Sequence, residues 1–233
     1  MNATNVVINA KDSAEIASNI TANNNVNITA GNGVTFTESA NTASNQGTAV
    51  NVGIGAGTTI NVETCVAVPH VNGSVGVNKT DNASSTATGA NVAAGNDIKI
   101  NANNGDVNLH GTNLVSNNSV EVESNKVNTS GAISSVNEKN LTVNVNGSYA
   151  SGKPNGGINA KGKNEANVTN TANTIQSDNV VITTGSPTGL SVNNTTINGN
   201  NVAYYYDDSK APAANRYTYR PRQPSYAKRR LRY

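Results

Sequence analysis

The side chains that could perform chemistry are few in this chain and widely separated. Before position 200, Asp occurs at positions 12, 81, 97, 106 and 178, so no two of these carboxylates share one short extended segment. Acid and base catalysis, or cation binding by carboxylates, needs such groups to converge on one face. Arg is absent from the first 203 residues. The sequence therefore predicts no polysaccharide-cleaving or other catalytic activity. We instead expect Asp97 and Asp106 to satisfy backbone donors at corners before strands.

Metal and cofactor sites are not predicted either. His70 and His110 stand 40 residues apart, and Cys65 lies near only the first of them. A zinc site would need at least one more ligand at short spacing. The single Cys excludes an internal disulfide. No amphipathic helical pattern follows the run from Gly53 to Gly57, so a tight turn is expected there and not a phosphate-binding loop.

The elements that would position any site are short strands that recur along the chain. Asn25-Val-Asn-Ile-Thr29 shows the pattern, in which apolar and polar residues alternate over four to six positions. The same pattern occurs at 5–9, 49–52, 97–101, 119–123, 140–145 and 179–183, with second strands at 33–37, 59–62 and 106–109. The first strands follow one another after about 20 residues or after about twice that interval. Repetition with this period indicates a solenoid, and a doubled interval indicates a degenerate or decorated turn.

One such strand buries almost nothing, because alternate side chains point to opposite faces. Stacking strands from successive turns in parallel register joins their apolar faces into a continuous core. The predicted fold is therefore all-β, a right-handed parallel β-helix with turns of roughly 20 residues. Asn accounts for 44 of the 233 residues, and stacked Asn side chains can form hydrogen-bonded ladders at the corners. A disordered Asn-rich segment and a β-sandwich are the alternatives, but neither explains the period.

The repeat is interrupted between residues 63 and 96. Val66, Val68, Val71, Val75 and Val77 alternate around Pro69 and Asn72-Gly73, which predicts a hairpin. Residues 84–94 are small and polar and are expected to form a loop. The predicted domain organisation is thus a β-helical shaft over 1–203 with a hairpin or loop insertion at 63–96. Insertions of this kind leave a solenoid at a corner and often carry its recognition surface.

The last 30 residues differ from the rest in charge. Residues 1–203 carry eight Lys and twelve acidic residues, whereas 204–233 hold all six Arg, two Lys and two Asp, together with seven of the eight Tyr. Three Pro residues there disfavour regular structure, so we expect a disordered basic tail. Candidate polyanion-binding residues are Arg216, Arg220, Arg222, Lys228, Arg229, Arg230 and Arg232; candidate stacking residues are Tyr217, Tyr219 and Tyr226.

No signal-peptide pattern follows Met1 and no transmembrane pattern is present, although the composition resembles that of extracellular proteins. A coil that begins at Val6 would expose an open strand edge. The sequence is therefore expected to be a piece of a longer protein.

Two segments resemble haemagglutinin repeats. They are Asn-Val-Asn-Ile-Thr-Ala-Gly-Asn-Gly-Val at 25–34 and Ala-Gly-Asn-Asp-Ile-Lys-Ile-Asn-Ala-Asn-Asn-Gly-Asp-Val-Asn-Leu at 94–109. Such repeats build the shafts of filamentous haemagglutinin-like adhesins, and the basic Tyr-rich ending resembles the C-termini of leukotoxin-type filamentous adhesins. The resemblance implies a C-terminal fragment of an exoprotein that a Gram-negative bacterium exports by two-partner secretion to its surface. Its outer-membrane transporter would engage an amino-terminal domain that is absent here.

The function that follows from these patterns is attachment to host cells, other bacteria or matrix, through surface glycans or proteins as partners. No cofactor is expected. An alternative is a surface protein that binds polyanions, such as lipopolysaccharide, glycosaminoglycan or DNA, through its basic tail. The tail could also anchor the adhesin at the producing cell. A toxin-delivery shaft is a third class, but 30 residues after the coil are too few for a folded toxin domain.

Overall fold

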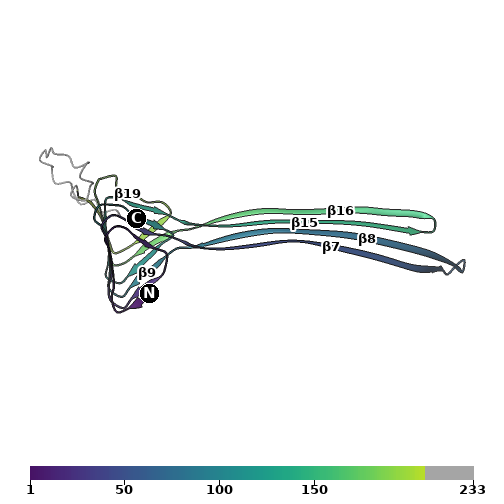
Figure 1. The fold of residues 1–233 in the computed structure, drawn as a ribbon, viewed down its shortest axis with the longest axis horizontal. Helices are drawn as coiled ribbons and strands as arrows, with labels where there is room; N and C mark the ends of the chain where they lie inside the picture. Colours follow the sequence, from purple (N-terminus) through teal and green to yellow (C-terminus); the bar gives the residue numbers. More distant parts are fainter. Residues whose placement is uncertain (208–233) are drawn as a thin grey trace. The chain divides into compact units, whose positions relative to one another are not determined.

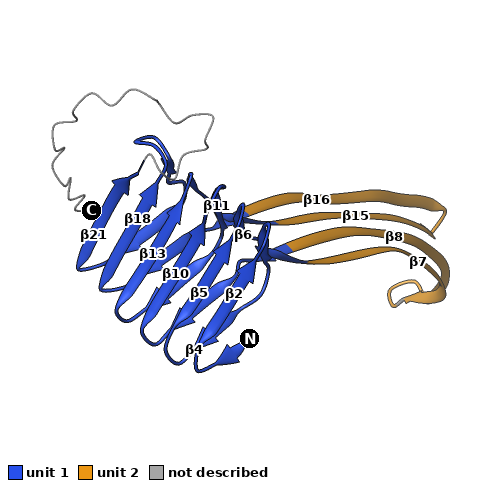
Figure 2. Ribbon diagram, turned by 60° about the vertical axis from the view of Figure 1, so that its left-hand side comes forward, with its two compact units in different colours: residues 1–40, 86–134, 169–233 blue, residues 41–85, 135–168 orange. Residues whose placement is uncertain are grey.

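The fold was analysed in a computed structural model, which describes residues 1–207. This part of the chain is built from strands alone and contains no helix (Figure 1). Consequently no helix in residues 1–207 could cross a membrane. The structure divides into two compact units (Figure 2). We call the first, residues 1–40, 86–134 and the described part of 169–233, the coil, and the second, residues 41–85 and 135–168, the arm.

The coil has three walls, each a parallel sheet of strands from successive turns. The first wall contains β1 (Asn2–Ala3), β4 (Ile20–Ala22), β9 (Asn91–Ala94), β12 (Asn113–Ser116), β17 (Asn173–Gln176) and β20 (Thr195–Asn198). The second contains β2 (Val6–Ala10), β5 (Val26–Ala30), β10 (Asp97–Ala102), β13 (Ser119–Ser124), β18 (Asn179–Thr184) and β21 (Asn201–Tyr206). The third contains β3 (Ala14–Ile16), β6 (Val34–Phe36), β11 (Val107–His110), β14 (Val127–Ser130) and β19 (Leu190–Ser191). Because the chain visits the walls in turn, the predicted parallel β-helix is confirmed.

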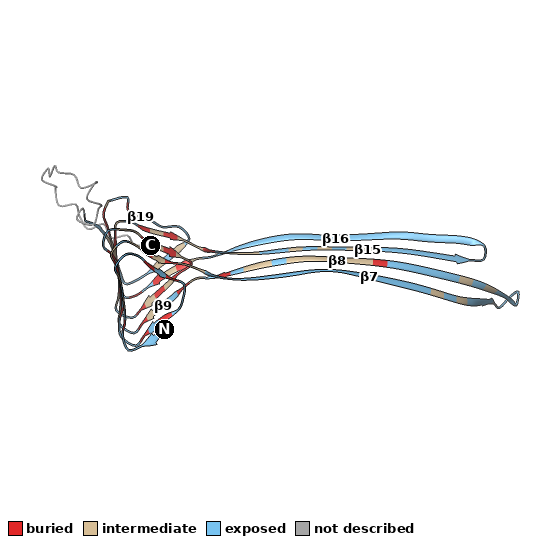
Figure 3. Ribbon diagram, in the orientation of Figure 1, coloured by how far each residue is buried: buried red, intermediate tan, exposed pale blue. Residues whose placement is uncertain are grey.

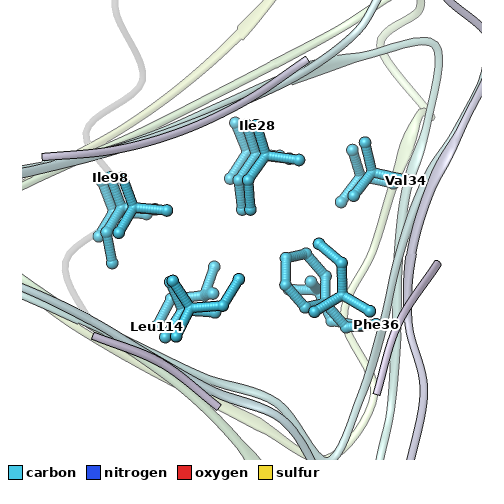
Figure 4. Close-up of a cluster of buried hydrophobic side chains, with 14 of the residues drawn as sticks. Ile28, Val34, Phe36, Ile98 and Leu114 are labelled. Carbon is cyan, nitrogen blue, oxygen red and sulfur yellow. The ribbon is translucent and has the colours of Figure 1, made fainter. Parts of the chain in front are cut away.

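The register of strand pairing places equivalent apolar residues of successive turns next to one another. In the second wall, Val26 pairs with Val6 on one side and with Ile98 on the other, and Ile28 pairs with Ile8 and Ile100. These side chains belong to the buried core, where equivalent residues of successive turns stack in columns, and separate columns contain Phe36 and Leu114 (Figure 4). Val26, Ile28 and Phe36 expose 1% or less of their surface. Val and Ile therefore suffice to fill a narrow interior, and the core includes no residue of the arm.

Asn and Asp side chains connect the turns at the corner before the second wall. Asn201 donates from Nδ2 to Asn179 Oδ1 at 3.0 Å, and Asn179 donates to the carbonyl of Asn118 at 3.0 Å. Asn118 in turn donates to Asp97 Oδ1 at 2.8 Å. The predicted Asn ladder is thus present. Asp97, expected to satisfy backbone donors, accepts instead from side chains, including Ser119 Oγ at 2.7 Å.

The arm consists of two hairpins that leave the coil after β6 and after β14. The first is β7 (Ser39–Asn61) and β8 (Val66–Thr88), and the second is β15 (Ala132–Ala150) and β16 (Lys153–Thr171). They form one sheet in the order β16-β15-β8-β7, with β8 and β15 antiparallel. β11, which lies between β6 and β14 in its wall, passes to β12 through Gly111 and Thr112 alone.

The structure of the arm shows that several predictions made from the sequence are wrong. The segments at 49–52, 59–62 and 140–145 belong to β7, its turn and β15, and not to the coil. The excursions span 41–85 and 135–168 where an insertion at 63–96 was expected, and residues 91–94 form the coil strand β9. Asn72-Gly73 lies within β8, and the first hairpin turns at 62–65, where Cys65 adopts a φ of 49°. The run from Gly53 to Gly57 is extended within β7 and is not a tight turn.

Candidate contact surface on the arm

The tail residues singled out from the sequence lie outside the described part of the structure. This applies to all seven Arg and Lys candidates and to Tyr217, Tyr219 and Tyr226. The predicted boundary at residue 203 is wrong, because β21 continues to Tyr206 and pairs with β18. Tyr204 packs against the core of the coil, and its hydroxyl lies 2.7 Å from Thr184 Oγ1. Tyr204 is therefore a structural residue of the last described turn.

The structure does not bring the other chemical candidates together. His110 belongs to the coil, where its Nδ1 lies 2.5 Å from Ser130 Oγ, while His70 and Cys65 belong to the first hairpin. Within residues 1–207, no group of three or more His, Cys, Asp or Glu side chains is placed to hold a metal ion. Asp178 is held at a corner of the coil by Asn200 at 2.9 Å, whereas Asp81 lies within β8 of the arm.

The arm is a single antiparallel layer whose two faces differ in polarity. A Cβ built on Gly53 would lie 2.8 Å from Ser74 Oγ, and one built on Gly57 would lie 2.6 Å from the His70 ring. Because these built Cβ atoms would contact side chains of β8, the side chains at odd-numbered positions of β7 lie on the same face of the sheet as those at even-numbered positions of β8. The pairing of β8 with β15 extends this face to Asn144 and Asn146. We call this side, rich in Asn, Gly and Ser, the polar face.

The opposite side carries the aliphatic residues of all four strands, and we call it the apolar face. Its members include Val50, Val52 and Ile54 on β7, Val71 and Val75 on β8, Leu141, Val145 and Tyr149 on β15, and Ile158 on β16. Val75 lies directly opposite Val145, and Val71 lies opposite Tyr149. These cross-strand pairs stabilise the sheet.

No second layer of the described chain covers the apolar face. Ile54 exposes 84% of its surface, Ile158 75%, Val52 67% and Val75 42%. The contrast with the buried interior of the coil is visible in Figure 3. Antiparallel sheets in soluble proteins usually pack one face against a core and leave the polar face in water. A contiguous exposed apolar surface on a protein is typical of a binding site.

Both faces of the arm carry charged side chains, and those of the polar face include a cluster of ion pairs. There Lys163 lies 2.7 Å from Glu138 and 3.1 Å from Glu165, and hydrogen bonds to these two carboxylates raise the pKa of Lys163. On the apolar face, charges occur only toward one end, where Gln46 donates to Asp81 at 2.9 Å. The central part of the apolar face is uncharged, so its chemistry suits apolar contact.

The polar face holds a shallow depression of about 480 Å³. Its lining combines amide and hydroxyl groups with exposed backbone: Gly53, Ile54, Gly55, Asn72, Gly73, Ser74, Asn146, Gly147, Ser148, Asn155 and Gly156. Neutral donors and acceptors of this kind can hydrogen-bond a hydroxylated or amide-bearing surface group. The depression provides no titratable side chain and hence no acid or base.

Sequence reasoning singled out part of the apolar face, at 49–52, 140–145, Val71 and Val75, but assigned it differently, and it missed Tyr149 and Ile158. The alternation at 49–52 and 140–145 is the same in a coil strand and in a hairpin strand. The useful signal was the long interval between some repeats: paired coil residues are 72 positions apart across the first hairpin and 61 across the second, against 20 or 22 between turns with no excursion. Such an interval accommodates an excursion as well as a turn.

The stacked parallel walls and short repeated strands define a β-solenoid. A family model described as hemagglutinin repeat matches residues 71–204, which is more than half of the chain. The chain therefore belongs to the hemagglutinin repeat family and is a filamentous haemagglutinin-like protein, as its sequence resemblance indicated. This is an adhesin-like family and not one of enzymes. No curated protein and no solved structure matched in the other two comparisons.

Proposed function

We propose that this protein is a non-catalytic adhesive module in which the coil is a shaft and the arm makes the adhesive contact. The observation that supports this proposal most directly is the exposed, uncharged central part of the apolar face, around Val52, Val75, Val145 and Ile158. A solenoid gives a stable repeated scaffold, and contact residues are often carried on segments that leave such a scaffold. The family membership supports an adhesive role at the surface of a Gram-negative bacterium.

The partners that we propose are proteins or glycans of host cells, other bacteria or matrix. An apolar surface fits a protein partner, whereas the amides of the depression on the polar face fit a glycan. Export through an outer-membrane transporter of the two-partner type is part of the same proposal, because the family makes use of that route.

The test is adhesion by variants of each face. Replacing both Val75 and Val145 with Thr keeps the β-branched shape but places hydroxyl groups on the apolar face. We expect about tenfold weaker binding to host epithelial cells or to immobilised matrix protein, equivalent to a loss of about 1.4 kcal/mol. The matched control replaces Asn78 and Asn144 with Thr on the polar face, outside the depression. Equal binding by wild type and V75T/V145T would refute a contact through the apolar face.

Polyanion binding by the tail is a second candidate function, which the positive charge of the tail sequence favours. Beyond Asp208 the sequence has eight Lys and Arg residues and no acidic residue. Because Tyr204 belongs to the coil, the appropriate deletion removes 208–233 and leaves β21 intact. We expect that deletion to abolish salt-sensitive retention on heparin. Unchanged retention would exclude Arg216, Arg220, Arg222, Lys228, Arg229, Arg230 and Arg232 as the binding residues.

A further inference from the structure

The outer edge of β7 differs from that of β16, the other edge strand of the arm. β7 is 23 residues long and contains no charged residue and no Pro. Its main-chain groups on the outer side pair with no strand of the described chain, since β7 ends the sheet. Proteins normally protect an exposed edge with Lys, Pro, bulges or short strands, because an open edge recruits further strands. β7 lacks three of these safeguards: it contains no Lys and no Pro, and it is not short.

The β16 edge is protected in the expected way. Its 19 residues include Lys153, Pro154, Lys161 and Lys163. Pro154 offers no N–H to an added strand, and Lys153 and Lys161 place charged side chains along the edge, while Lys163 is paired with Glu138 and Glu165. The two edges of one sheet therefore have opposite properties, and only the β7 edge is suited to strand addition.

We propose that the β7 edge is an interaction surface for the β7 edge of a second copy of this chain. An antiparallel pair of β7 strands is self-complementary, so a two-fold axis closes the assembly as a dimer. Pairing of β7 with β16 of another copy would instead repeat without closing and would meet Pro154. The absence of charge along β7 means that the homotypic pair brings no like charges together.

The side chains favour one register. If Val52 lies opposite Val52 of the second copy, Val50 lies opposite Ile54, and all three residues remain on the apolar face. Aliphatic residues directly opposite each other stabilise an antiparallel pair. On the polar face the same register places Asn51 opposite Gly53, with no clash of large side chains. The dimer then has one continuous eight-stranded sheet whose apolar face is twice as wide.

Oligomeric state tests the proposal with the full 233-residue chain. Light scattering after gel filtration at about 100 μM should give a dimer for the wild type. Replacing Ala49 and Asn51 with Lys puts charges on the β7 edge without changing the apolar face, and it should give a monomer. Replacing Asn159 and Asn167 with Lys adds the same charge to β16 and should leave the dimer intact.

Cross-linking tests the register. Directly opposite residues in an antiparallel pair have Cα atoms about 4.5–5.5 Å apart, within reach of a disulfide. In a Cys65→Asn background, Val52→Cys should form a covalent dimer on mild oxidation, and Ile158→Cys should not. A monomeric wild type would overturn the proposal, as would a dimer that A49K/N51K leaves intact. Loss of the dimer in V75T/V145T but not in A49K/N51K would show stacking of apolar faces instead.

Discussion

At the scale of single residues, a buried amide holds three strands of the coil together. Asn173 is fully buried; its Oδ1 accepts from the Thr112 N–H at 2.7 Å, and its Nδ2 donates to the Ser130 carbonyl at 2.8 Å. These partners come from the corner before β12 and from the end of β14. Asn173 stands where the second hairpin rejoins the coil, and its side chain satisfies one main-chain group at the corner of the preceding turn and one where that hairpin leaves. Buried polar groups without such partners are costly.

Asn173→Ala should therefore be strongly destabilising. The substitution leaves the Thr112 N–H and the Ser130 carbonyl without the side-chain partner that each has now. The Ser130 carbonyl still accepts from the Gly111 N–H, so the Thr112 N–H is the group left unsatisfied. We expect the free energy of unfolding to fall by about 1–3 kcal/mol. Urea denaturation followed by circular dichroism measures this change. Asn200→Ala, at an exposed corner, should change stability by less than about 0.5 kcal/mol; an equally small effect of Asn173→Ala would contradict the structural role.

An ion pair on the outside of the coil provides a pH-dependent signal. Lys99 on β10 lies opposite Glu121 on β13, with Nζ 3.1 Å from Oε2. The hydrogen bond to Glu121 raises the pKa of Lys99 above its usual value of 10.5. Because the pKa in the folded state exceeds that in the unfolded state, the pair stabilises the fold at pH values below 10.5. This contribution is lost as the pH rises through the raised pKa.

Lys99→Gln should accordingly lower stability only below the pH at which Lys99 loses its proton. At pH 8 we expect a difference of less than about 1 kcal/mol from the wild type, since both side chains are largely exposed. At pH 12 the difference should disappear. Paired urea titrations of the two proteins at both pH values isolate this effect from other groups that titrate. A difference that persists at pH 12 would show that Lys99 acts through packing and not through charge.

At the scale of elements, the corner between the third and first walls decides whether the chain turns or leaves the coil. β11 passes to β12 through Gly111, which has a φ of 59°. A Cβ there would lie 2.5 Å from the Ala132 Cβ and 3.0 Å from the Ala132 nitrogen. Ala132 is buried and begins β15. Only Gly allows this corner to be tight while the next turn begins its excursion.

Gly111→Ala should destabilise the coil by more than the backbone strain alone. A residue with a Cβ costs about 1–2 kcal/mol in the left-handed region, and the contact with Ala132 adds to that cost. We expect a total loss of at least about 2 kcal/mol in urea denaturation. Gly152→Ala is the matched control, because Gly152 has a φ of 76° but open space around it. Equal losses for the two variants would show that the contact with Ala132 contributes nothing.

At the scale of the whole molecule, the coil and the arm differ in what stabilises them. The coil has a continuous apolar core to which the arm contributes no residue. The arm is a single layer in which cross-strand pairs and main-chain hydrogen bonds provide the cohesion. Sheets without a covered face are only marginally stable in water. This difference fits a division of roles between a scaffold and a contact surface.

Removal of the arm should leave the coil folded. Deleting 41–85 and 135–168, with two-residue Gly-Asn linkers in their place, keeps every core residue of the coil. We expect a β-type circular dichroism spectrum and a cooperative melt within about 5 °C of that of the full chain. The same protein should no longer adhere, because the apolar face is gone. A random-coil spectrum would show that the hairpins are needed to form the core.

The sequence by itself determined the class of fold, because the alternation of apolar residues and the period near 20 are local properties of the chain. Val26, Ile28, Ile98 and Ile100 could be assigned to stacked turns on that basis, and the Asn ladders at the corners followed from the high Asn content. Only the tertiary structure decided where the chain leaves the coil. Val50 and Val52 alternate with small polar residues as Val26 and Ile28 do, so the side-chain pattern alone cannot select the partner. Parallel stacking in the coil and antiparallel pairing in the arm are distinguished by contacts between residues distant in sequence.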